Sequence, residues 1–410
     1  MSISPFGWFR ANAQLVAVLV TTAITMMGQG VMAPVLPLFA KEFGVSVTLV
    51  GLVVGVFGFG RIATNIPAGI LSDRFGRRAT LALGPAILAV ASLLMAASTS
   101  YWQLLVLRFA QGVGGGMYST TAMVYVAEVA GPDQRGRFIS YQQGALLLGS
   151  GIGPAVGGLV AEAFGLRAPF VLLAFLEATA CLWAVCQVSE PSTRPRPLDA
   201  TAVAASGPVR SPSARGVLAD PTFLVASLFG AALFIVRAGE RQGVLPLYLG
   251  SFGYGPGDIG MLFTIGVLAQ FLVVATFGGV SDRFGRKAVI VPGAATMAAG
   301  AVIFIVGHSY PVFVLAIVLQ QIGEGIAMPA PGAMVADLSR RLAGPGAALG
   351  VFRTISDSGL IVGPVVVGLI ADWAGYRWGL GFAALVILAA ALIVAAVARE
   401  PRWDAGRAPA

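Results

Sequence analysis

Cysteine, histidine and charge are all scarce in this sequence. Its 410 residues include two cysteines, one histidine and 11% charged residues, whereas soluble domains carry about 25% charged residues. Two cysteines provide neither a disulfide framework nor a thiolate metal site. A single histidine is too few for most other metal sites. We therefore expect no metal and no cofactor. No nucleophile–base pair stands out that would indicate an enzyme.

Apolar residues are abundant instead. They make up 57% of the chain, and the mean hydropathy is +0.86. This composition indicates an all-α polytopic membrane protein that lies in a lipid bilayer. The net charge of +8 does not indicate nucleic-acid binding, because the basic residues form short clusters between apolar runs and no aromatic–basic face accompanies them.

Twelve stretches of the sequence are long enough to cross a membrane. A crossing helix needs about 20 mostly apolar residues, because its backbone groups must bond within the segment. The stretches are residues 13–38, 48–71, 79–98, 102–128, 138–162, 168–188, 221–248, 258–280, 288–307, 312–337, 346–371 and 378–398. We predict twelve transmembrane helices.

The loops between these stretches differ in their content of lysine and arginine. If both termini are cytoplasmic, eighteen of these residues lie in cytoplasmic segments and three in external loops, as the positive-inside rule requires. The proline- and arginine-rich segment 190–220 is then a cytoplasmic linker. We predict two six-helix bundles, residues 1–189 and 221–410, in the cytoplasmic membrane, and we expect a monomer.

The two halves of the chain repeat each other at an offset of 209 or 210 residues. Among the matched positions are Ser72–Arg77 with Ser281–Arg286, Gly153-Pro154 with Gly363-Pro364, and Glu162 with Asp372. Because an even number of spans separates the copies, both halves face the same way. Secondary transporters built from two parallel bundles have such a repeat.

Motifs in both halves resemble those of the major facilitator superfamily. Residues 69–78 resemble its loop signature after the second span, and residues 278–287 resemble the second-half copy. Arg108 with Gln111 resembles its fourth-helix motif, and residues 149–158 resemble the fifth-helix motif of its drug:proton antiporters. The resemblance covers the whole chain. It implies the twelve-helix major facilitator fold and a secondary active transporter that exports small molecules in exchange for protons.

The resemblance of the loop signature to that family implies a charged latch between the two bundles in the outward-facing state. Its residues are Gly69, Asp73, Arg74, Gly76, Arg77 and Glu128, with Asp282, Arg286 and Asp337 as second-half counterparts. We expect Asp73 to accept hydrogen bonds from backbone donors at a neighbouring helix N-terminus, where the helix dipole favours an anion. The resemblance makes the start of the eleventh span that helix. We also expect Arg77 to reach Glu128.

Glycines follow one face of the fifth predicted span. Gly149, Gly153 and Gly157 lie four residues apart, and missing side chains there allow a partner helix to approach closely. With Pro154 and Gly158 they form the antiporter motif. Ordinary packing of small residues explains them equally well.

Nine charged residues lie within the predicted spans. A charge near the bilayer centre costs at least about 2.5–3.5 kcal/mol, so each needs a partner or water. Two pairs are spaced to meet on one helix face, Arg237 with Glu240 and Arg353 with Asp357. Glu177 lies on a helix that the family arrangement leaves outside, and we assign it to local packing or lipid contact. That arrangement implies a substrate cavity with the candidate residues Gln29, Arg108, Gln111, Arg237, Arg241 and Gln320.

We predict that Glu324 carries the coupled proton, with Asp357 and Glu240 as further candidates. Glu324 falls near the membrane midplane, and its own helix carries no basic residue. A carboxyl group in such a site can exchange a proton in response to substrate. The alternative is that Arg108 or Arg237, from a facing helix, keeps Glu324 permanently ionised.

The leading functional hypothesis is a proton-coupled exporter of small amphiphilic molecules such as drugs or lipids. The first span contains Gln29 but no carboxylate, and arginines outnumber acids on the helices assigned to the cavity. A neutral or anionic cargo is therefore an alternative to a cationic drug. The rival functions are a proton-coupled uptake symporter for a small metabolite and a membrane sensor or scaffold that has lost transport.

Overall fold

The structure is a computed structural model that describes residues 12–130, 135–190, 220–277, 285–339 and 345–398. These described residues are almost entirely helical and contain no strand. The first half comprises α2 (Ala13–Met32), α3 (Leu36–Lys41), α4 (Val47–Phe75), α5 (Arg77–Ala96), α6 (Tyr101–Val129), α7 (Arg135–Phe164) and α8 (Ala168–Gln187). The second half comprises α11 (Pro221–Phe234), the π-helical segment η1 (Ile235–Val244), α12 (Leu245–Gly250), α13 (Pro256–Phe277), α15 (Arg286–Val306), α16 (Tyr310–Ala327), α17 (Pro329–Ser339), α18 (Pro345–Ala374) and α19 (Tyr376–Val397).

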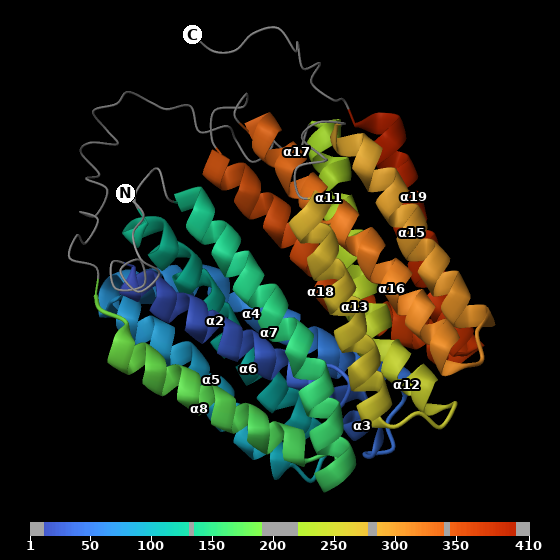
Figure 1. Ribbon diagram of the computed structural model, residues 1–410, viewed down its shortest axis with the longest axis horizontal. Coiled ribbons are helices and arrows are strands. Elements are labelled where there is room, and N and C mark those ends of the chain that lie inside the picture. Colours follow the sequence, from blue (N-terminus) through green and yellow to red (C-terminus); the bar gives the residue numbers. More distant parts are fainter. Residues whose placement is uncertain (1–11, 131–134, 191–219, 278–284, 340–344, 399–410) are drawn as a thin grey trace, which may run out of the picture.

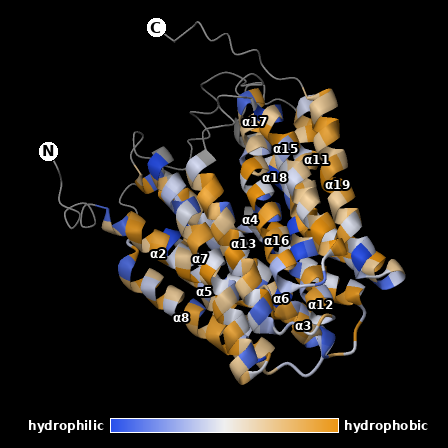
Figure 2. Cartoon of the chain, turned by 45° about the vertical axis from the view of Figure 1, so that its right-hand side comes forward, coloured by the Kyte–Doolittle hydropathy of each residue, from blue (hydrophilic) through white to orange (hydrophobic). Residues whose placement is uncertain are grey.

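The helices have the length and composition of membrane spans. Among the described residues, eleven helical units are long and apolar enough to cross a membrane. The long helix α6, which carries Arg108, provides the remaining crossing. Hydrophobic residues, coloured orange in Figure 2, predominate along most of the helices, as expected where lipid is the solvent. The predicted all-α fold with twelve transmembrane helices is confirmed.

The helices pack mainly within their own half of the chain. In the first half α2 packs against α7 and α8, while α6 packs against α4 and α5. In the second half α15 packs against α16 and α19, and α11 against α18. Two long seams join the halves, α4 with α18 and α7 with α13. Figure 1 shows the two groups of helices, with α3 and α12 near each other at one end of the molecule. The predicted linker, residues 190–220, lies almost entirely outside the described residues.

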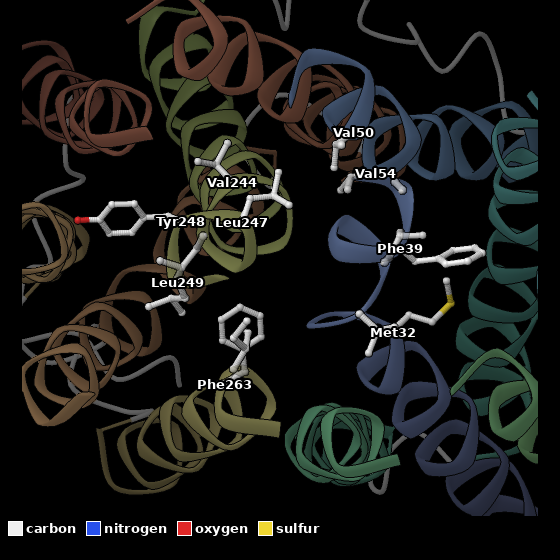
Figure 3. Close-up of a cluster of buried hydrophobic side chains, with 14 of the residues drawn as sticks. Met32, Phe39, Val50, Val54, Val244, Leu247, Tyr248, Leu249 and Phe263 are labelled. Atoms are coloured by element: carbon white, nitrogen blue, oxygen red, sulfur yellow. The ribbon is translucent and has the colours of Figure 1, made fainter. Parts of the chain in front are cut away.

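A shared apolar cluster closes the end of the molecule that carries α3 and α12. It combines Met32, Phe39 and Val50 of the first half with Leu247 and Phe263 of the second, and Figure 3 shows side chains from both halves. Two further clusters each lie within one half. Burial of a common apolar core therefore holds the halves together at this end.

A glycine with a positive φ directly precedes the helix that follows the loop signature in each half. Gly76, with φ of 95°, ends α4 and precedes α5, and Gly285, with φ of 93°, precedes α15. Residues with a β-carbon rarely adopt this conformation. The glycine of the signature thus allows a tight reversal between two long helices.

Candidate functional site

A cavity of about 100 Å³ lies between the two halves. Its walls come from α2 and α7 of the first half and from η1 and α13 of the second. Met26, Leu146, Phe263 and Val267 provide apolar surface. The polar lining residues are Gln29, Ser150, Arg237, Arg241, Gln242 and Gln270. This mixture of apolar walls and a few polar groups is typical of a small-molecule site.

The π-helical geometry of η1 determines where its charged side chains point. Hydrogen bonds from residue i to i+5 widen each turn, so residues four apart share a face and residues three apart do not. Arg237 and Arg241 both reach Glu324 of α16, with Nη1–Oε distances of 3.8 and 2.5 Å. Arg241 also donates to Gln321. The predicted pair of Arg237 with Glu240 is not formed, because that prediction assumed α-helical spacing.

Glu324 is therefore an ion-paired carboxylate. Its side chain is 3% exposed, and both of its oxygens lie near an arginine of the facing segment η1. This geometry matches the alternative in which an arginine keeps Glu324 ionised, with Arg241 as the closer partner. Removal of Glu324 would leave these guanidinium groups without their counter-ion in the protein interior.

Glu240 occupies a different environment from Glu324. It is fully buried, and its described hydrogen bond comes from Gln320, whose Nε2 donates to Oε1 at 2.7 Å. Oε2 of Glu240 and Oε1 of Gln320 are both buried and have no hydrogen-bond partner. Two acceptors in adjoining groups thus lack a donor, and buried polar atoms without partners are rare.

Asp357 and Arg353 do not form the predicted ion pair on α18. Among the described residues, Asp357 is 3% exposed and has no carboxylate–cation contact within 4 Å. Arg353 extends toward the first half, where its Nη1 lies 3.4 Å from the sulfur of Met123. Arg61 repels the charges of Arg353 and Arg237, while Asp357 attracts Arg353 and Glu324 attracts Arg237. Three arginines, Arg61, Arg237 and Arg353, thus lie close enough to interact near the contact of the two halves.

The fourth-helix residues lie outside the cavity. Arg108 donates to Oε1 of Gln111 at 2.8 Å and covers the ring of Phe57 at 4.4 Å. Gln111 is fully buried and donates to Ser92 of α5 at 2.8 Å. Both side chains are used in packing within the first half and are absent from the cavity lining, as is Gln320. Of the predicted cavity residues, the structure places Gln29, Arg237 and Arg241 there.

The loop signature forms an ion-pair cluster within the first half. Arg77 donates to both oxygens of Glu128, at 2.7 and 3.0 Å, and contacts Asp73 at 2.6 Å. In the second half Arg286 lies 3.4 Å from Asp337, while Asp282 is outside the described residues. A β-carbon on Gly69 would meet nothing within 4 Å, and Arg74 lies over the ring of Phe75.

Glu190, which belongs to none of the sequence motifs, caps the helix that follows this loop. Its oxygens accept from the backbone N–H groups of Arg77 and Arg78, at 2.7 and 3.0 Å. Asp73, which we expected to accept from a neighbouring helix N-terminus, instead binds the Arg77 side chain and is 70% exposed. A lone acid 113 residues from its partner offers no sequence signal.

Asp73→Asn is expected to lower the transport rate more than the amount of protein. An exposed ion pair contributes only about 0–1 kcal/mol, so the substitution should leave stability nearly intact. Transport should fall if Asp73 engages the second half in another state. Initial rates normalised to protein level measure this effect, and unchanged rates would remove the latch role.

The glycines of α7 lie against the backbone of α2. A β-carbon on Gly157 would lie 2.7 Å from Cα of Val31, and one on Gly153 would lie 2.7 Å from Cα of Gly30. Gly149 is similarly close to Ala23 and Met27, whereas Gly158 faces Pro256 of α13. Pro154 also contacts both Gly30 and Gly260. The motif thus packs α7 within its own half and across one seam.

Gly157→Ala is expected to destabilise the protein by about 1–3 kcal/mol, the usual cost of overpacking. The cause is overlap between the new methyl group and the Val31 backbone. Thermal unfolding in detergent measures the change. Gly144→Ala in the same helix is the matched control, because its β-carbon would meet nothing within 4 Å. Equal melting temperatures for the two variants would contradict this packing role.

Glu177 is buried inside the first half and does not face lipid. It is 0% exposed, and Thr25 of α2 donates to its Oε2 at 3.2 Å. Helix α8 packs against α2 and α5, so of the two predicted roles local packing is confirmed and lipid contact is wrong. Its other oxygen has no partner.

The protein consists of two halves of membrane-crossing helices with a charged cavity between them. This arrangement is that of a membrane transporter. The sequence model described as the Major Facilitator Superfamily matches residues 18–240 and 241–409. The chain belongs to this superfamily, and it is a multi-pass membrane transporter rather than an enzyme.

Relatives and solved structures extend over nearly the whole chain. The tetracycline resistance protein, class C, of Escherichia coli is 28% identical over 93% of this chain and 97% of its own. Multidrug resistance protein 1 of Bacillus subtilis is 24% identical over 88% and 91%. A bacterial homologue of the human lysosomal transporter Spinster, in an inward-facing unoccupied conformation, has a TM-score of 0.78 at 16% identity, covering 96% and 97%. A D-xylose–proton symporter has a TM-score of 0.75 at 18% identity, covering 94% and 98%.

Proposed function

We propose that this transporter is a proton-coupled exporter, an antiporter of small amphiphilic molecules. It lies in the cytoplasmic membrane with both termini in the cytoplasm, as the lysine and arginine distribution favours. Relatives named for tetracycline and multidrug resistance support the direction of transport. The glycines and Pro154 of α7 also favour export, because they resemble the antiporter motif.

The pair formed by Glu240 and Gln320 is the observation that best supports proton coupling. A proton on Oε2 of Glu240 supplies a donor where Oε2 and the adjoining Oε1 of Gln320 both lack one. The result is a carboxylic acid–amide pair, in which Nε2 of Gln320 donates to Oε1 of Glu240 and the acid proton on Oε2 is donated to Oε1 of Gln320. Glu240 is therefore the proton carrier in this proposal. Glu324 serves instead as the counter-ion of Arg241 and Arg237.

The segment η1 links the proton to the cargo. Glu240 lies on it between Arg237 and Arg241, which line the cavity. A change of charge at Glu240 acts directly on these arginines, since charges interact strongly in a low-dielectric interior. The proton site and the two cavity arginines thus lie on the same ten-residue segment, η1. We propose that each disfavours the other, which is the requirement for antiport.

The charges around the cavity favour a cargo without net positive charge. Arg237 and Arg241 line it, and Arg61 lies close enough to repel Arg237. Glu324, together with Glu240 when Glu240 is unprotonated, neutralises part of this charge. A lipophilic cation would meet repulsion here, whereas the apolar walls accept an uncharged amphiphile without electrostatic cost.

Everted membrane vesicles containing the protein test this function. An imposed acid interior should drive accumulation of phenylnaphthylamine, an uncharged fluorescent amphiphile, in preference to the cation ethidium. Anilinonaphthalene sulfonate provides an anionic comparison. Accumulation that requires an acid exterior would indicate uptake symport, and no accumulation of any of the three probes would favour a sensor or scaffold. Ethidium as the preferred probe would contradict the cargo class.

A further inference from the structure

An acid from the second half of the chain caps a helix of the first half. Asp372, at the end of α18, accepts from the backbone N–H groups of Val47 and Thr48 at 2.8 and 2.7 Å. The hydroxyl of Thr48 adds a third bond at 2.6 Å. These N–H groups belong to the first turn of α4, where they have no partner within the helix. A carboxylate there also gains from the helix dipole.

A related contact occurs on the opposite seam. Glu162, at the end of α7, is the repeat counterpart of Asp372 at an offset of 210 residues. Its carboxylate lies on the start of α13, because a β-carbon on Gly257 would overlap Oε2. Each seam therefore has an acid from one half against the first turn of a helix in the other half.

The two contacts differ in the number of donors they offer. At an offset of 209 residues, Val47 and Thr48 correspond to Pro256 and Gly257. Proline has no backbone N–H, and glycine has no hydroxyl. Three donors bind Asp372. At the equivalent positions opposite Glu162, one of these donors remains, the backbone N–H of Gly257. Hydrogen bonds to a charged acceptor are stronger than those between neutral groups. Because Asp372 has more such bonds, its contact should be stronger than that of Glu162.

Both contacts lie at the end that the shared apolar cluster closes. Backbone atoms approach closely beside each of them, at Gly51 against Pro364 and at Gly260 against Pro154. At the opposite end Asp73 is largely exposed and paired within its own half. This end of the structure is thus held by contacts between the halves, while toward the opposite end Arg353 of the second half contacts the sulfur of Met123.

We propose that Asp372, with Glu162 as a weaker counterpart, is a positioning residue that holds this end closed during the transport cycle. To open this end, α4 must leave Asp372, and the three hydrogen bonds must be exchanged for water. The apolar cluster provides most of the closed surface, while the carboxylate fixes the register of α18 on α4. The proposal rests on the transport function only in requiring that the protein alternates between ends.

Thiol labelling at both ends tests the proposal. Cys181 and Cys186 are first replaced by alanine. One reporter is Val54→Cys, which is 5% exposed in the shared cluster, and the other is Met123→Cys, which is 47% exposed and lies beside Arg353. Asp372→Asn should raise the labelling rate of the first reporter by about threefold to tenfold and lower that of the second. Labelling needs neither cargo nor a proton gradient, so the result is independent of proton-coupled export.

Two further variants compare the donors. Thr48→Val, which removes one donor from the Asp372 contact, should give the same reciprocal change at a smaller size. Glu162→Gln is the matched control for the opposite seam, and its effect should be smaller than that of Asp372→Asn. A rise at both reporters would mean a loosened fold and would overturn the proposal, as would unchanged rates in Asp372→Asn. An equal effect of Glu162→Gln would overturn the difference between the two contacts.

Discussion

Replacement of Glu240 by glutamine is expected to abolish accumulation of cargo against its gradient while exchange of cargo continues. Glutamine keeps the size of the side chain and its hydrogen bonding to Gln320 but cannot take up the coupled proton. With one proton per cargo molecule, a difference of one pH unit supports about tenfold accumulation. The variant should reach about equal concentrations on both sides. Accumulation and counterflow in proteoliposomes measure the two activities.

Glu177→Gln is the matched control for this substitution. Both glutamates are fully buried, and each has one oxygen without a hydrogen-bond partner. Glu177 lies within the first half, however, among α2 and α8, and is absent from the cavity lining. Its variant should therefore still concentrate cargo. Coupling that survives in Glu240→Gln, or is lost equally in Glu177→Gln, would exclude Glu240 as the proton carrier.

Glu324→Gln is expected to destabilise the protein by about 3–5 kcal/mol, the usual cost when one partner of a buried ion pair is removed. The variant leaves Arg241, whose side chain is 9% exposed, without its carboxylate at 2.5 Å. Arg237 loses its weaker contact as well. Chemical unfolding in detergent at constant pH measures the loss.

A double-mutant cycle separates the ion pair from other effects. Arg241→Gln in combination with Glu324→Gln should recover part of the lost stability, because the uncompensated guanidinium is gone. Stability also distinguishes the two acids. Glu324→Gln should lose stability, whereas Glu240→Gln should keep its stability and lose proton coupling. Additive losses in the double variant would show that Arg241 and Glu324 do not depend on each other.

The fold followed from the sequence because its causes act over long stretches. About 20 apolar residues are required for each crossing, and twelve such stretches are visible without knowledge of any contact. The repeat also predicted two halves that face the same way. The close approach of Gly153 and Gly157 to α2 likewise follows from their four-residue spacing.

The charged site was less predictable because it depends on local backbone geometry. An α-helical spacing pairs Arg237 with Glu240, but η1 is π-helical and directs Arg237 and Arg241 together toward Glu324. Spacing also suggested that Arg353 pairs with Asp357, whereas Arg353 extends toward Met123 of the other half. Contacts between halves are not recorded in the spacing of residues along one helix.

Proton release on cargo binding tests the central claim most directly. Phenylnaphthylamine is added to the purified protein in unbuffered detergent solution, and the pH change is recorded beside the fluorescence of the bound probe. If the proton on Glu240 and the cargo exclude each other, the wild-type protein releases up to one proton for each probe bound, and Glu240→Gln releases none. Proton uptake by the wild-type protein, or equal release by the two proteins, would contradict the account.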